Sequence, residues 1–219
     1  MESMRVTVEL STPMQLPEHP IHLDGVLSAL HVQCLEEAGH SDPWSEQHSL
    51  PLARYVAPDG EWCFKASLFS GVPAMEPFFS PLAYRINLAQ VAEDRASGLL
   101  ALRSAKANTA GGPFRTGIHL KPMAWLLKLE AYAVGDVAAV QDLLAGLIFI
   151  GPGRSRAAGR VHAVTVEHVP ESSLRWAQRA LPAACDLPLP FAVALCAGTL
   201  RAPYWKRRSA TETLFPVGC

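Results

Sequence analysis

The sequence lacks a long apolar run, which limits the classes of protein to which it can belong. Of its 219 residues 49% are apolar, yet the longest uninterrupted apolar stretch covers only residues 143–150. A membrane-spanning helix needs roughly 20 such residues. Near the N-terminus, Glu2 and Arg5 interrupt the apolar core that a secretory signal would need. We therefore expect a soluble, cytoplasmic protein with no membrane partner.

Closely paired cysteines and clustered carboxylates are also lacking. The five cysteines are odd in number and widely spaced: Cys34, Cys63, Cys185, Cys196 and Cys219. Such spacing provides neither a disulfide framework nor the ligand set of a zinc site. No carboxylate cluster indicates magnesium. We expect reduced thiols, no metal and no cofactor.

An excess of positive charge is missing as well. The formal net charge is −1, so composition gives no support to a protein that coats nucleic acid. The distribution of charge is more informative than its sum. Acidic residues concentrate in the first half, whereas basic residues gather in segments 103–121, 154–160 and 201–208.

The hydrophobic periodicity predicts an α+β fold. Alternating patterns predict strands over residues 5–10, 62–69, 84–88, 125–134, 161–168 and 191–200. Helical spacing predicts helices after Asp24, over 137–147 after Asp136, and over 173–181, with both aspartates as caps. The order β-α-β-β-α-β is that of a ferredoxin-like (RRM-like) core. We expect this core in residues 1–170, an inserted hairpin and loop region at about 70–122, and a C-terminal extension over 171–219.

A glycine- and arginine-rich segment lies between the second predicted core helix and the last core strand. It contains Gly151, Gly153, Arg154, Ser155, Arg156, Gly159 and Arg160. Glycine lets the main chain approach a polyanion and turn its N–H groups toward phosphate oxygens. Arginine adds forked, permanently charged donors. The combination suits an RNA backbone.

Two nucleotide-binding glycine motifs are excluded by spacing. A dinucleotide fingerprint would need glycine where Arg156 stands and would follow a strand, and a P-loop would need Gly-Lys-Ser/Thr. An ordinary exposed helix-to-strand turn remains the alternative for this segment.

The same segment resembles the signature of the CRISPR-associated RAMP superfamily, a basic glycine-rich loop between the last helix and last strand of a ferredoxin-like fold. The matching residues are Gly151, Gly153, Arg154, Arg156, Gly159, Arg160 and Val161. Segments 21–27 (IHLDGVL) and 203–206 (PYWK) also look like the small guide-RNA-binding subunit of type IV effector complexes. The resemblance implies a non-catalytic subunit that holds the 5′ handle of CRISPR RNA. Its implied partners are backbone and large subunits, with target DNA in the assembled complex.

Two further groups of cations are candidate RNA contacts. Arg115 and Lys121, with Arg103 and Lys106, surround a glycine-containing loop in the insertion, from which related subunits extend a thumb-like hairpin. Lys206, Arg207 and Arg208 follow Tyr204 and Trp205, and aromatics interleaved with cations stack bases and neutralise phosphates. The alternatives are an irregular surface loop and a solvated tail whose rings pack on the core.

Two other functions stay open. Some RAMP relatives cut the CRISPR repeat without metal, using a histidine near the first helix, and the histidines to consider are His22, His31, His40 and His119. Their spacing does not define the base, acid and cation that such a site needs. The other alternative is a ferredoxin-like scaffold that binds proteins and no RNA.

Overall fold

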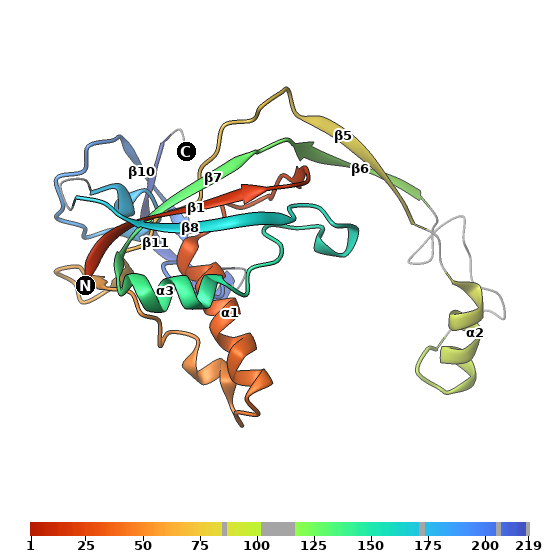
Figure 1. Ribbon diagram of the computed structural model, residues 1–219. Coiled ribbons are helices and arrows are strands. Elements are labelled where there is room, and N and C mark those ends of the chain that lie inside the picture. The colour runs from red at the N-terminus through yellow and green to blue at the C-terminus, as the bar shows by residue number, and fades with distance from the viewer. Residues whose placement is uncertain (85–86, 102–116, 171–173, 205–206, 218–219) are drawn as a thin grey trace. The chain divides into compact units, whose positions relative to one another are not determined.

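The chain combines α-helices with several small antiparallel sheets (Figure 1). The computed structural model describes residues 1–84, 87–101, 117–170, 174–204 and 207–217. The α-helices are α1 (Leu23–Glu37), α2 (Leu88–Ala96) and α3 (Val137–Leu144). The strands are β1 (Glu2–Leu10), β2 (Met14–Gln15), β3 (Arg54–Val56), β4 (Trp62–Phe64), β5 (Phe78–Tyr84), β6 (Gly117–Ala124), β7 (Lys128–Gly135), β8 (Val161–His168), β9 (Leu181–Pro182), β10 (Val193–Gly198) and β11 (Thr211–Pro216).

The chain forms two compact units. The larger unit contains Met1–Glu76 and Ala124–Cys219, and the smaller contains Pro77–Met123. In the smaller unit β5 and β6 form an antiparallel hairpin, with Phe78 opposite Met123. Helix α2 lies between these strands in the sequence. It begins where the Asn87 side chain accepts hydrogen bonds from the Ala89 and Gln90 N–H groups.

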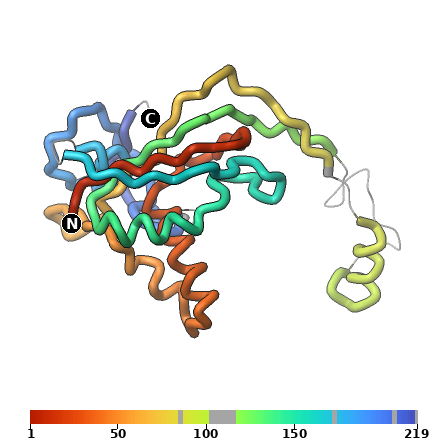
Figure 2. Tube along the Cα trace, viewed as in Figure 1, coloured from red at the N-terminus to blue at the C-terminus, as the bar shows by residue number. Residues whose placement is uncertain are grey.

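The central sheet of the larger unit has β1 in the middle. β1 pairs antiparallel with β7 on one side and β8 on the other, so Val6 lies opposite Ala131 and Val166. Figure 2 shows these strands side by side although they are far apart in the sequence. Isolated antiparallel bridges add the segment after β4 to the outer edge of β7, at Ala66–Ala133 and Ser70–Glu130.

One face of this sheet forms the main core. Alternate β1 residues point to it, and Met4, Val6 and Val8 are fully buried. Helices α1 and α3 cover that face (Figure 1) and contribute Leu27 and Val140, both also fully buried. Each aliphatic side chain buried in this way stabilises the fold by about 1.5–3 kcal/mol. The alternation of the strands and the apolar stripes of the helices therefore converge on one core.

A second core joins the C-terminal residues to the β3–β4 hairpin. The C-terminal sheet has the order β10-β11-β9. Trp176, Leu181 and Leu200 are buried together with Tyr55 of β3 and Cys63 of β4. The residues after β8 thus pack as part of the larger unit.

Several strands and one cap agree with the sequence patterns. The segments 5–10 and 161–168 lie in β1 and β8, β7 overlaps 125–134 from Lys128 onward, and β10 occupies a shorter part of 191–200. The Asp136 carboxylate accepts the Ala139 N–H, as expected for the cap of α3. β4 covers only the first three residues of 62–69, and bridges continue the pairing beyond it.

Other expectations were wrong. The residue at the N-cap of α1 is His22, and Asp24 lies buried in the first turn, where it pairs with a distant arginine. The expected helix over 173–181 is only a short 3-10 turn, Leu174–Ala177, followed by β9. Pro182 disfavours helical geometry at the residue before it. Of the strand expected over residues 84–88, Tyr84 ends β5 and Leu88 begins α2, while residues 85–86 lie outside the described residues. β3 and β11 had no counterpart in the patterns.

Among the described residues, no helix is long and apolar enough to cross a membrane.

Candidate nucleic-acid interface

The glycine-rich loop connects α3 to β8, and its glycines are required by its backbone. Gly151, Gly153 and Gly159 have φ angles of 82°, 86° and 67°, in the left-handed region that favours glycine. A β-carbon on Gly159 would lie 2.1 Å from the Ile150 carbonyl oxygen. The loop therefore depends on glycine at this position for both its backbone conformation and its close packing.

The segment after β1 fixes the loop in place. The Thr12 hydroxyl donates to the Ala157 carbonyl oxygen at 2.7 Å and accepts the Arg160 N–H at 2.9 Å. The Gly159 N–H donates to the Pro13 carbonyl oxygen at 2.9 Å. The second half of the loop is thus held to the segment after β1, and the loop is not a free surface turn.

The three arginines of the loop are exposed and available. Arg154 and Arg156 lie in a 3-10 turn, Arg154–Arg156, and Arg160 directly precedes β8. In the part of the chain that the structure describes, none of the three forms an ion pair with a carboxylate. Arg156 donates to the Gln15 side-chain oxygen at 2.6 Å. Their positive charges therefore remain uncompensated.

Three successive N–H groups of the loop add to this charge. The N–H groups of Gly153, Arg154 and Ser155 have no acceptor among the described residues. Gly153 is left-handed and the turn after it is right-handed, and this alternation makes a concave row of N–H groups that suits an anion. Ser155, which is exposed at the same turn, offers a hydroxyl. The loop can bind a phosphate group with both main-chain and side-chain donors.

The structure describes only some of the other predicted cations. Lys121 is half-buried in β6 opposite Ser80, within the smaller unit. Arg208 is exposed in the 3-10 turn Arg207–Ser209, which also contains Arg207. Arg115, Lys206, Arg103, Lys106 and Trp205 lie outside the described residues.

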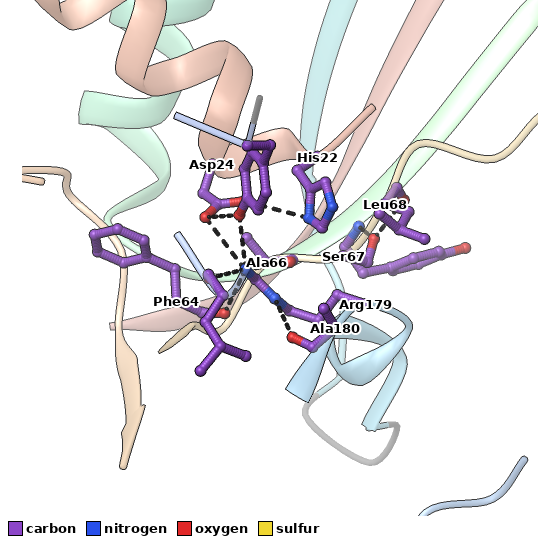
Figure 3. A network of polar contacts seen from close by, with 11 residues as sticks. His22, Asp24, Phe64, Ala66, Ser67, Leu68, Arg179 and Ala180 are labelled. Atoms are coloured by element: carbon purple, nitrogen blue, oxygen red, sulfur yellow. Dashed lines mark hydrogen bonds and ion pairs between the residues drawn. The ribbon is translucent and has the colours of Figure 1, made fainter. Parts of the chain in front are cut away.

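A buried polar network joins the first helix to the C-terminal segment (Figure 3). The Arg179 guanidinium and the Asp24 carboxylate are both fully buried and 3.3 Å apart. The Tyr204 hydroxyl donates to Asp24 at 2.6 Å and accepts from Arg179 at 2.7 Å. The remaining guanidinium N–H groups donate to the carbonyl oxygens of Phe64, Ala66, Ala180 and Leu200. Burial lowers the pKa of Arg179, but Asp24 and Tyr204 more than offset this, and the net pKa is raised.

His22 belongs to this network and not to an exposed site. Its ring stacks on Tyr204 with centroids 3.7 Å apart, and the residue is only 7% exposed. Burial and the Arg179 charge hold the pKa of His22 well below its ordinary value. Tyr204 is half-buried, and His22 covers one face of its ring, so that face is not available to a base. Local sequence patterns do not reveal this network, because Asp24 and Arg179 lie in segments far apart in the sequence. The one usable signal is the position of an arginine among apolar residues.

No group of histidine, cysteine, aspartate and glutamate side chains in the described residues is arranged to hold a metal ion.

Comparison with known proteins gives one family. The family model described as Csf3, CRISPR type IV associated protein Csf3, matches residues 2–216. No curated protein sequence matches the chain. The family match spans both compact units and includes the glycine-rich loop and the buried network.

Proposed function

The chain belongs to the Csf3 family of CRISPR type IV associated proteins, and from this premise we propose that it binds the 5′ handle of CRISPR RNA and caps the filament of backbone subunits. Membership of the family implies that it works together with other type IV subunits. In the proposed complex base pairing reads the target DNA, while this subunit holds RNA through shape and charge.

One observation carries the proposal: in the described residues, the glycine-rich loop has three exposed arginines without carboxylate partners beside three N–H groups without acceptors. Guanidinium groups are suited to phosphate, and a row of N–H groups strengthens such a site. A merely structural turn would not need three uncompensated cations. The anchoring by Thr12 keeps these donors in a fixed arrangement before RNA arrives.

The proposal includes a ferredoxin-like core of the RAMP type. Its support is the antiparallel order β8-β1-β7, extended by the bridged segment at Ala66 and Ser70. Helix α1 follows β1, and α3 connects β7 to β8. The glycine-rich loop then occupies the link between the last core helix and the last core strand, which is the position of the RAMP signature.

The open face of the central sheet is a weaker candidate for RNA. Arg5 pairs with Glu167 and lies 3.9 Å from Glu130, which also pairs with Lys128 at 3.0 Å. The cations of that face are therefore already compensated, in contrast to those of the loop. This difference favours the loop as the contact with the RNA backbone.

The proposal does not include catalysis. A histidine that cuts RNA must reach the 2′-hydroxyl or the leaving oxygen, whereas His22 is buried under Tyr204. Incubation of the purified protein with labelled repeat RNA and no metal should leave the RNA intact. A single defined cut would favour the endoribonuclease alternative.

The decisive experiment replaces Arg154, Arg156 and Arg160 together with glutamine. We expect the effector complex assembled with this variant to lose CRISPR RNA, seen as a fall in the ratio of absorbance at 260 and 280 nm. In direct binding to handle RNA, the logarithm of the association constant falls linearly with the logarithm of the salt concentration. For the variant the magnitude of this slope should be smaller by about 2, at roughly 0.7 for each lost phosphate contact.

A matched control variant has the same change in net charge at positions outside the loop. Replacing Arg5, Lys128 and Arg175 with glutamine removes the same number of positive charges from the open face of the central sheet, where Arg175 lies over the Tyr132 ring of β7. This control should retain RNA. Equal retention by the loop variant would count against the proposal, and a complex that never carries RNA would favour the scaffold alternative.

A further inference from the structure

The larger unit contains a polar cavity that is separate from the glycine-rich loop. Its volume is about 160 Å³. The residues that line it come from the loop before β3, the segment after β10 and the beginning of β11: Gln47, His48, Thr199, Leu200, Arg201, Ala202, Pro203, Ser209 and Thr211. Cavities for drug-sized ligands begin at about 300 Å³, so this one fits a small group.

The lining of the cavity is rich in hydrogen-bond donors. The residues that line it carry one guanidinium group, one side-chain amide, one imidazole and the hydroxyl groups of Thr199, Ser209 and Thr211. No carboxylate is among the lining residues. A donor-rich cavity of this size with one permanent cation matches a small oxyanion better than a cation or an apolar group.

Arg201 is held in position at this cavity. Its guanidinium lies 4.7 Å from the centre of the Trp62 ring and pairs with Glu61 at 3.2 Å. A second guanidinium, that of Arg54, lies 4.3 Å from the same ring centre and donates to the His48 carbonyl oxygen. Two cations therefore adjoin one aromatic ring, and Glu61 compensates only one of them directly.

The positive charges near this cavity act on the imidazole of His48. Its Nδ1 atom is buried and has no hydrogen-bond partner in the described part of the chain. Burial, then Arg201 and Arg54, lower the pKa of His48, while Asp24 raises it slightly. Burial does not favour an anion at this site, but the positive charges of Arg201 and Arg54, which disfavour a proton on this ring, would favour an anion beside it.

From the size, the donors and the two guanidinium groups, we propose that this cavity is a second site that binds a phosphate group. The phosphate can belong to a nucleic-acid strand or be a free anion, since the recognition chemistry is the same. The site goes beyond the proposed handle contact and uses none of the residues of the loop.

The test is a titration of the full-length protein with inorganic phosphate, followed by NMR of the isotope-labelled histidine rings. We expect the His48 signals to shift on binding. Arg201→Gln should weaken binding about tenfold or more, because it removes a charge-assisted donor. Glu61→Gln should strengthen binding several-fold, because it removes the competing carboxylate. Arg5→Gln, a charge-matched change on the sheet face, should alter affinity less than about twofold.

Other arms separate the sources and the two sites. The probes are inorganic phosphate, a uridine dinucleotide with a 5′ phosphate and the same dinucleotide with a 5′ hydroxyl. If the phosphorylated dinucleotide binds more tightly than both other probes, the ligand is a strand end. If it binds no more tightly than inorganic phosphate, the ligand is a free anion. The triple loop variant should keep the His48 response. The proposal is overturned if phosphate leaves the His48 signals unchanged, if Glu61→Gln and Arg201→Gln both bind like the wild type, or if the loop variant abolishes the response.

Discussion

Replacing Tyr204 with phenylalanine tests whether the buried network holds the C-terminal segment to the first helix. The change keeps the ring that stacks on His22 and removes only the hydroxyl. That hydroxyl donates to the Asp24 carboxylate at 2.6 Å and accepts from the Arg179 guanidinium at 2.7 Å. Both partners are charged and fully buried.

The expected cost follows from these two bonds. A hydrogen bond to a charged group contributes about 1.5–3 kcal/mol. The two losses do not add fully, because Asp24 and Arg179 keep each other at 3.3 Å and Arg179 keeps its carbonyl acceptors. We therefore expect the free energy of unfolding to fall by about 2–4 kcal/mol, a large fraction of the roughly 5–15 kcal/mol that stabilises a typical domain.

The assay is urea unfolding followed by circular dichroism and tryptophan fluorescence. Tyr132→Phe is the matched control, because the Tyr132 hydroxyl also accepts from an arginine, Arg175, at 2.7 Å, but that arginine is exposed. The control should lose less than about 1 kcal/mol. Equal losses in the two variants, or a negligible loss in Tyr204→Phe, would refute the view that burial gives this network its strength.

Three other predictions concern single groups. Burial holds the pKa of His22 well below its ordinary value, whereas in the unfolded chain the imidazole is protonated below about pH 6.5. The contribution of His22 to the free energy of unfolding should therefore be fully present above that pH and be lost as the pH falls below it. His22→Phe should reduce the slope by up to about 1.4 kcal/mol per pH unit in unfolding measured between about pH 7 and 5. Gly159→Ala should lower the free energy of unfolding by more than the roughly 1–3 kcal/mol that a left-handed backbone conformation costs, because the added β-carbon would collide with Ile150. Gly39 is also left-handed but has open space around it, so Gly39→Ala should show only the backbone cost. Burial raises the pKa of Cys63 to about 11, so its thiol should react slowly near pH 8. After brief alkylation at that pH, mass spectrometry should find Cys34 and Cys196 modified and Cys63 intact. Early labelling of Cys63 would contradict its burial.

Local patterns predicted those elements whose sequence and environment agree. β1 and β8 alternate in sequence and lie in a sheet with one covered face, so the period of two was sufficient. Asp136 caps α3 because a short acceptor side chain stands directly before an apolar helical stripe. The same rule failed at Asp24, where a buried ion pair within the tertiary structure uses the carboxylate.

The composition of the glycine-rich loop could also be read from the sequence, and with it the resemblance to the family that the comparison then gave. The sequence could not say whether Arg154, Arg156 and Arg160 are free. That depends on which carboxylates the rest of the chain brings near them. It equally could not assemble the phosphate cavity, whose His48 and Arg201 are separated by most of the chain.

The sequence by itself determined the alternation of the core strands, the apolar stripes of the helices and the chemistry of the loop, because these depend on residues a few positions apart. Only the tertiary structure decided which polar groups are buried together, as for Asp24, Arg179 and Tyr204, and which cations stay uncompensated. The physical reason is that the energy of a charge depends on its burial and on its nearest partners in space. Those partners come from distant segments that only the folded chain brings together.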